Sequence, residues 1–408
     1  MIHRASPRGR AAPRLILGNL DCESDFARAS GAVTAQGSLP NRVLTTISVA
    51  ATLLRVFARS EDRLWLPSAV PETTLRDVEG LARPHLVSGS IPQVTRSEGI
   101  LAWGETPRVA ALRRKTGTAR RNTGEDRVAR LWNASRSTPE AAAVVNDRWF
   151  CTELADELGC ALPGTRLIHS LDELEAHLAA GGANAASGHW VLKARFSAAG
   201  RWRLIHHQPR VPAARSVRRM LERHGPLLFE PWMERTLDVG CCGLLDDTGL
   251  SRIGSHILRV DAAGRFQGVE LFVGKDSCEA AALEPADARA LESALKRCSD
   301  ALGAQSYRGP FGIDAWRYRQ PNRALAFHPL GEINARLTFG WVAHALVDRL
   351  RKPYGIAPGS TVRLTFDRQL PESCTGSERP TRVIPLAVAS QPIPQAIWLD
   401  IRPAEGAL

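Results

Sequence analysis

Residues 311–340 read FGIDAWRYRQPNRALAFHPLGEINARLTFG and carry the strongest structural signal in this 408-residue chain. Apolar and polar residues alternate on both sides of a polar turn at residues 319–323, which predicts two strands joined by that turn. Because neighbouring side chains of a strand point to opposite faces, Asp314 faces away from the apolar Ile313 and Ala315. The first strand therefore presents a single carboxylate on its polar face.

The second strand adds three polar side chains to that carboxylate. Its period of two residues places Glu332, Asn334 and Arg336 on one face. Two carboxylates, an amide and a guanidinium suit a magnesium-nucleotide site, because Mg²⁺ binds hard oxygen ligands and a guanidinium clamps anions. A solvated strand face is the alternative that these residues alone leave open.

A lysine and a loop of small residues lie earlier in the chain. Residues 189–194, HWVLKA, predict a strand with Lys193 near its end, and the sequence SAAG follows at residues 197–200. An ammonium group beside a loop whose backbone can approach closely suits nucleotide phosphates. A surface lysine is the alternative reading of Lys193.

The order of these segments resembles the ATP-grasp family, in which an Asp on one strand and a Glu-x-Asn-x-Arg on the next hold Mg·ATP. The resemblance covers about residues 145–350. Residues 145–150, VNDRWF, look like the family's first segment, with Arg148 where many members have a second phosphate-binding lysine. Residues 227–234, LLFEPWME, are similar to the hinge between the family's two subdomains.

This resemblance implies a cofactor and a set of site residues. The cofactor is ATP with Mg²⁺, with Mn²⁺ as the alternative ion. The metal ligands of the family correspond to Asp314, Glu332 and Asn334, and its catalytic residues to Arg336 and Lys193. Its nucleotide-binding positions correspond to Arg148, Lys193, Ser197, Gly200, Glu230, Trp232, Met233 and Asp238.

The fold class that the resemblance implies is α/β (α+β), with an N-terminal open α/β domain followed by a two-subdomain ATP-grasp fold. Alternating strand and helix patterns in the first part of the chain favour the open sheet. The expected divisions are an N-terminal domain at residues 1–140, a small subdomain at 141–230, a large subdomain with the Mg-ATP site at 231–352, and a Pro-rich tail with short strands at 353–408.

Individual elements can be predicted within these divisions. The N-terminal strands are expected at residues 14–18, 63–67, 99–104 and 128–132, with a helix at residues 41–59. Turn sequences at residues 246–249 and 261–264 predict antiparallel strands in the large subdomain. Apolar residues at helical spacing predict a helix at residues 285–302.

The activity that the resemblance implies is ligation: a carboxylate is activated as an acyl phosphate and then attacked by an amine or a similar nucleophile. The implied partners are small-molecule carboxylate and amine substrates, and a homodimer is left open. Two alternatives remain, namely a kinase that phosphorylates without ligation and a nucleotide-binding protein without turnover. The identity of the substrates cannot be read from the sequence.

Composition limits the other function classes. The net charge is +11, but 48 of the 53 basic residues are Arg, a bias typical of GC-rich coding and of a bacterial source. No nucleic-acid-binding motif accompanies the charge, so a nucleic-acid partner is not favoured. The eight cysteines show no metal-ligand spacing and no secretory signal is evident, which favours reduced thiols in a cytoplasmic protein. The longest apolar stretch, residues 43–57, is too short and too polar for a membrane span.

Overall fold

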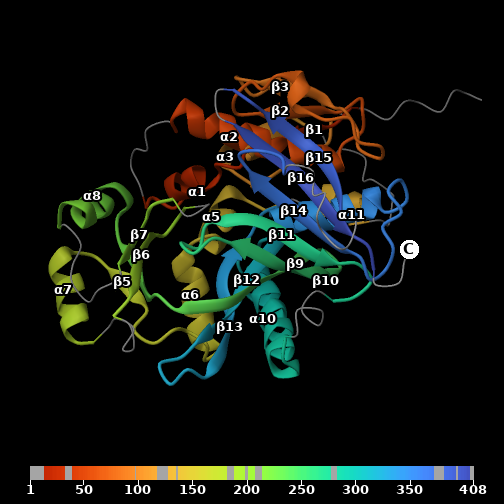
Figure 1. The fold of residues 1–408 in the computed structure, drawn as a ribbon. Coiled ribbons are helices and arrows are strands. Elements are labelled where there is room, and N and C mark those ends of the chain that lie inside the picture. Colours follow the sequence, from red (N-terminus) through yellow and green to blue (C-terminus); the bar gives the residue numbers. More distant parts are fainter. Residues whose placement is uncertain are drawn as a thin grey trace, which may run out of the picture.

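The computed structural model describes residues 13–32, 39–96, 98–116, 127–134, 137–181, 188–197, 201–206, 214–276, 283–371, 381–391 and 394–404. Within these residues the strands form three sheets, two of four strands and one of eight. Figure 1 shows the N-terminal sheet above the large sheet and the second four-stranded sheet to its left. Sheets and helices together confirm the predicted α/β class.

The N-terminal domain is an open parallel sheet with the strand order β3-β2-β1-β4. The side chains of β1 are fully buried, as expected for a parallel strand that is covered on both faces. The strands are β1 (Leu15–Leu17), β2 (Arg63–Leu66), β3 (His85–Ser88) and β4 (Ile100–Ala102). The helices are α1 (Glu23–Ala29), α2 (Asn41–Ala51), its 3₁₀ continuation η1 (Thr52–Phe57), a short 3₁₀ turn η2 (Glu72–Thr74), α3 (Pro107–Lys115), α4 (Arg127–Ala134) and α5 (Pro139–Val145).

One predicted N-terminal strand is wrong. Residues 128–132 belong to the helix α4, and the fourth strand of the sheet is β3, which the sequence analysis did not identify. The apolar residues Val128, Leu131 and Trp132 have the spacing i, i+3, i+4, which places them on one side of a helix. Leu131 is fully buried, so this helical side faces the core.

The second four-stranded sheet is antiparallel and has the order β5-β8-β6-β7. It has its own apolar core, in which Trp190, Leu192 and Phe229 pack together. The elements of this unit are α6 (Arg148–Glu157), β5 (Arg166–Ile168), α7 (Leu171–Ala179), β6 (Trp190–Ala194), β7 (Arg203–His206), α8 (Ala214–His224) and β8 (Leu227–Pro231). The predicted strand that carries Lys193 is therefore confirmed as β6.

The large sheet has the order β13-β12-β9-β10-β11-β14-β16-β15 and is antiparallel. Its strands are β9 (Glu234–Asp246), β10 (Gly249–Val260), β11 (Phe266–Phe272), β12 (Gly309–Arg319), β13 (Leu325–Asn334), β14 (Thr361–Asp367), β15 (Arg382–Ala389) and β16 (Gln395–Arg402). Two helices accompany it, α10 (Pro285–Ala304) and α11 (Phe339–Leu350). The hairpins predicted at residues 246–249, 261–264 and 319–323 are confirmed.

The strands after residue 353 extend the large sheet. β14 pairs with β11, and β16 and β15 continue outward from β14. The buried Arg55 of the N-terminal domain donates hydrogen bonds to the backbone oxygens of Arg76 (2.8 Å) and Leu386 (3.1 Å). The C-terminal strands thus link the large sheet to the N-terminal domain.

The N-terminal domain also contacts the strands that carry the predicted site. The backbone N–H of Leu337 donates to the carbonyl oxygen of Trp103 at 2.9 Å. The buried residues of the N-terminal domain and of the large sheet form one continuous apolar core. None of the helices that the structure describes is both long enough and apolar enough to span a membrane.

Candidate functional site

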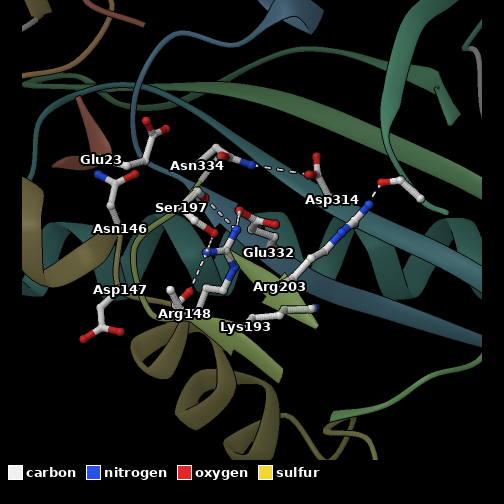
Figure 2. A network of polar contacts seen from close by, with 12 residues as sticks. Glu23, Asn146, Asp147, Arg148, Lys193, Ser197, Arg203, Asp314, Glu332 and Asn334 are labelled. Carbon is white, nitrogen blue, oxygen red and sulfur yellow. Dashed lines mark hydrogen bonds and ion pairs between the residues drawn. The ribbon is translucent and has the colours of Figure 1, made fainter. Parts of the chain in front are cut away.

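The carboxylates of the two predicted strands lie side by side. In the register of β12 and β13, Asp314 pairs with Glu332 and Gly312 pairs with Asn334. Residues that pair directly across antiparallel strands share a face, so these three polar side chains converge. The Asn334 amide nitrogen donates to the Asp314 carboxylate at 3.4 Å (Figure 2).

Apolar residues on the opposite face hold this arrangement in place. Phe311, Ile313 and Ala315 are all fully buried in the core. A shift of the strand register by one residue would exchange the two faces and expose these side chains. The alternation of the sequence therefore fixes the direction in which Asp314 points.

Burial and a neighbouring carboxylate both disfavour the charged form of Asp314. Burial and then the charge of Glu332 raise the pKa of Asp314 to about 7, although Arg336 partly opposes this shift. Two crowded carboxylates and the carbonyl oxygen of Asn334 offer the hard oxygen donors that a divalent cation prefers. No cluster of three or more His, Cys, Asp or Glu side chains with metal-binding geometry exists in the described residues.

Arg148 connects the small sheet to this pair. Its Nη1 donates to the Ala194 carbonyl and to the Ser197 hydroxyl, both at 2.9 Å. Its Nη2 donates to the Ser197 carbonyl at 2.7 Å and to Glu332 Oε1 at 2.9 Å. Figure 2 shows the guanidinium between Ser197 and Glu332. A single side chain thus positions both the loop after β6 and one carboxylate of the large sheet.

Lys193 forms an ion pair with Glu230 on the neighbouring strand β8. Lys193 Nζ lies 2.5 Å from Glu230 Oε2, and both side chains are nearly buried. Burial lowers the pKa of Lys193 from its ordinary value, and the charge of Glu230 only partly offsets this. In this structure the two residues that were predicted to contact phosphate and adenine bind each other.

The strand geometry predicted for Arg336 is wrong. β13 ends at Asn334, and the Arg336 N–H donates to the Asn334 carbonyl at 2.8 Å in a tight turn. The Asn146 side chain accepts from the Ala335 N–H at 3.0 Å and donates to the Ala335 carbonyl at 3.2 Å, which holds this turn. The Arg336 guanidinium lies 2.9 Å from Glu23 Oε1 in the N-terminal domain.

The residues near the predicted hinge surround a stacked guanidinium. Arg235 Nη1 donates to Asp238 Oδ1 at 2.9 Å. Its guanidinium lies 3.7 Å from the ring centroid of Trp316 and 5.6 Å from that of Trp232. The guanidinium thus makes cation–π contacts with two flat indole rings, and flat aromatic surfaces of this kind also suit a nucleobase.

A cavity of about 660 Å³ brings most of these side chains together. A second cavity, of about 1010 Å³, shares Trp232, Arg235 and Asp238 with the first and is also lined by Met233. Glu230 reaches the first cavity through Lys193, and Gly200 lies outside the described residues. The predicted residues that line the first cavity are Arg148, Lys193, Ser197, Trp232, Asp238, Asp314, Glu332, Asn334 and Arg336.

Several cavity residues escaped the sequence analysis. Trp103 and Arg42 line it from the N-terminal domain, where no spacing pattern links them to the site. His256 lies two strands away from Asp314, in the row formed by His256, Gly240 and Asp314 across β10, β9 and β12. Burial, together with the charge of His344, lowers the pKa of His256 to about 3, so its imidazole is neutral. The alternation of polar and apolar residues along β10 is the sequence signal that could have indicated the direction of the His256 side chain.

Comparisons with known proteins give structural but not sequence matches. No protein-family model matches this chain, and no curated protein matches it. N5-carboxyaminoimidazole ribonucleotide synthetase from Thermus thermophilus is 15% identical, with a TM-score of 0.50 over 96% of this chain and 94% of that one. Biotin carboxylase from Campylobacter jejuni, solved as a β-γ-ATP complex, is 10% identical, with a TM-score of 0.51 over 95% and 87% of the two chains.

A third match is the biotin carboxylase domain of 2-oxoglutarate carboxylase from Hydrogenobacter thermophilus. That structure is a dimer with MgADP, ADP and bicarbonate. It is 12% identical, with a TM-score of 0.51 over 97% of this chain and 87% of that one. Similarity over nearly the whole length at such low identity indicates a common fold rather than a common substrate.

Proposed function

We propose, since this chain has the ATP-grasp fold, that it is an ATP-dependent ligase that activates a carboxylate as an acyl phosphate for attack by an amine or a similar nucleophile. The predicted fold is confirmed. The solved structures with this fold include a synthetase and two biotin carboxylases, which supports the ligase class. The carboxylate and the amine are the small-molecule partners in this proposal.

The observation that carries the proposal is the convergence of acidic, amide and basic groups from two parts of the chain on one cavity. The large sheet contributes Asp314, Glu332 and Asn334. The small sheet and its first helix contribute Lys193 and Arg148. Phosphoryl transfer requires mainly positioning and charge neutralisation, which this set of residues is suited to provide.

The donor set fits a divalent cation that accompanies ATP. Asp314, Glu332 and Asn334 would hold it, because two carboxylates and an amide present oxygen donors on one face of the paired strands. Bound Mg²⁺ would neutralise the charge on the phosphate oxygens of ATP. Mn²⁺ has similar ligand preferences and remains the alternative ion.

The chain's own residues position the substrates in this proposal. Lys193 and Arg148 face the phosphates, with Arg148 also fixing the loop at Ser197. The hinge residues Trp232 and Met233, together with Asp238, adjoin the nucleoside. Arg336 faces the carboxylate that is to be activated.

The reaction then has two balanced steps. An oxygen of the substrate carboxylate forms a bond to the γ-phosphorus of ATP as the bond from that phosphorus to ADP breaks. The amine nitrogen next attacks the carbonyl carbon, phosphate leaves with the carbon–oxygen bonding pair, and the amine loses a proton. Arg336 would stabilise the developing negative charge in both steps.

A second candidate, a nucleotide-binding protein without turnover, is favoured by one specific observation. Each of the three cations that this proposal assigns to the phosphates or the carboxylate is already paired within the chain. Arg148 binds Glu332, Lys193 binds Glu230, and Arg336 binds Glu23. If these pairs persist with nucleotide bound, Arg148 would compete with the metal for Glu332.

The test is incubation with Mg·ATP, hydroxylamine and a panel of carboxylates. A hydroxamate formed together with ADP and phosphate supports the ligase, because hydroxylamine traps an acyl phosphate. A phosphorylated product that resists hydroxylamine would identify a kinase instead. Nucleotide binding in calorimetry with no ADP formed from any carboxylate would support the second candidate and overturn the ligase.

A further inference from the structure

The cavity that holds the candidate site has a second, apolar wall. Besides the acidic and basic groups described above, aromatic and aliphatic side chains line it. Three of these, Phe266, Phe339 and Phe366, come from three different elements, β11, α11 and β14. All three are only half-buried, so their rings are open to the cavity.

These rings form one continuous cluster. The ring centroids of Phe339 and Phe366 lie 4.7 Å apart, those of Phe266 and Phe366 5.4 Å apart, and those of Phe266 and Phe339 5.5 Å apart. Trp103 adds a fourth ring, 5.0 Å from Phe339. Such distances are typical of packed aromatic pairs, so the wall is a built surface rather than scattered apolar residues.

The aromatic wall begins beside Arg336. The Arg336 guanidinium carbon lies 5.7 Å from the Trp103 ring centroid, and Trp103 contacts Phe339. In the proposed pose, the carbon chain of a carboxylate held at Arg336 would pack along Trp103 and Phe339. The helix α2 extends this surface with the half-buried Val43 and Ile47.

A few polar groups adjoin the aromatic cluster. Arg42 and Thr46 are exposed on α2, and Gln395 and the neutral His256 also line the cavity. A polar substrate group placed against the three phenylalanine rings would lose its water without gaining a hydrogen-bond partner from them. An apolar group would bury both itself and the rings.

We infer that the activated carboxylate belongs to an apolar acid, with a branched aliphatic or aromatic group that packs on Trp103, Phe339 and Phe366. The inference rests on the proposed ligase function and names the substrate class of the same site. The phosphate-facing residues select the nucleotide, whereas the aromatic wall selects the acid. The wall is thus the specificity-determining surface.

The experiment compares acids of equal shape but different polarity in the hydroxylamine assay. Leucine is paired with asparagine and 4-methylpentanoate with succinamate, and phenylalanine and 3-phenylpropanoate test for ring-sized groups. We expect kcat/KM to favour the apolar member of each pair by at least about tenfold. A preference for asparagine or succinamate would overturn the inference and leave the ligase proposal intact. Absence of hydroxamate with every acid would overturn the ligase proposal itself.

Two variants connect the preference to the wall. Phe366→Ala should lower kcat/KM for the preferred acid at least about tenfold while the KM for ATP stays unchanged. Phe327→Ala is the matched control, because Phe327 is also a half-buried phenylalanine of the large sheet but does not line the cavity. Val43→Thr preserves shape and adds a hydroxyl, so it tests the wall even if Phe366→Ala folds poorly. An unchanged acid preference in Phe366→Ala and Val43→Thr would refute the role of this wall.

Discussion

Replacing Arg148 by lysine is the most informative single perturbation of the site. Lysine keeps the positive charge and is the residue that many ATP-grasp proteins have at this position, so a purely electrostatic role would tolerate it. Arg148, however, makes four hydrogen bonds from two different nitrogens, to Ala194, to Ser197 twice and to Glu332. A single ammonium cannot reach the loop and the carboxylate together.

The size of the effect follows from the contacts that are lost. A hydrogen bond from a charged donor contributes about 1.5–3 kcal/mol, and Arg148→Lys should lose the equivalent of one such bond or slightly more after water fills the gap. We therefore expect kcat/KM for ATP to fall roughly 10- to 100-fold, which corresponds to about 1.4–2.8 kcal/mol. Global stability should also fall, by up to about 1.5–3 kcal/mol, because the four hydrogen bonds are made within the folded chain.

The assay combines calorimetric titration with Mg·ADP, steady-state rates and urea unfolding. Arg195→Lys is the matched control. Arg195 directly follows strand β6 and binds Asp147, the residue that caps α6, but it does not line the cavity. Wild-type nucleotide affinity and turnover in Arg148→Lys would refute the idea that the guanidinium geometry positions the loop. An equal loss in Arg195→Lys would show that the effect is a general consequence of disturbing α6.

Three further predictions test neighbouring groups. Lys193→Ala should raise the KM for ATP and also lower the melting temperature, since it leaves the nearly buried Glu230 without its partner; a lowered melting temperature with an unchanged KM would contradict the phosphate-facing role. Arg336→Lys should lower the rate at saturating ATP by at least about tenfold, with nucleotide affinity nearly unchanged in calorimetry, because the bidentate fork acts mainly on charge that develops during transfer. The third prediction concerns pH. Because the pKa of Asp314 is raised to about 7 in the folded state, the folded protein without metal keeps a proton that the unfolded chain loses above its lower, ordinary pKa. The free energy of unfolding should therefore fall as the pH rises from about 4 to 7. Asp314→Asn should remove this part of the pH dependence of the melting temperature.

The paired strands of the site could be predicted because their signals are local. Alternation sets the faces of Asp314 and Glu332, and the polar turn at residues 319–323 sets the hairpin. The helix of residues 285–302 and the hairpins of the large sheet also follow from local periodicity. These elements are the ones whose register is fixed by one buried face.

Features that depend on tertiary contacts could not be read in the same way. Strand β13 stops at Asn334 because Asn146, far away in sequence, binds the backbone of Ala335. The partner of Arg336 is Glu23, in another domain. The helix α4 has too short an apolar pattern to be distinguished reliably from a strand by composition alone.

The central claim is that Asp314, Glu332 and Asn334 hold the divalent cation of a reacting nucleotide. Glu332→Gln tests it most directly, because it preserves shape, removes one charge and leaves an oxygen that can still accept from Arg148. The measurement is the Mg²⁺ dependence of ADP formation from ATP and a carboxylate, with the fold checked by circular dichroism. We expect the folded variant to lose turnover at every Mg²⁺ concentration. A wild-type rate with a wild-type Mg²⁺ dependence would contradict the account.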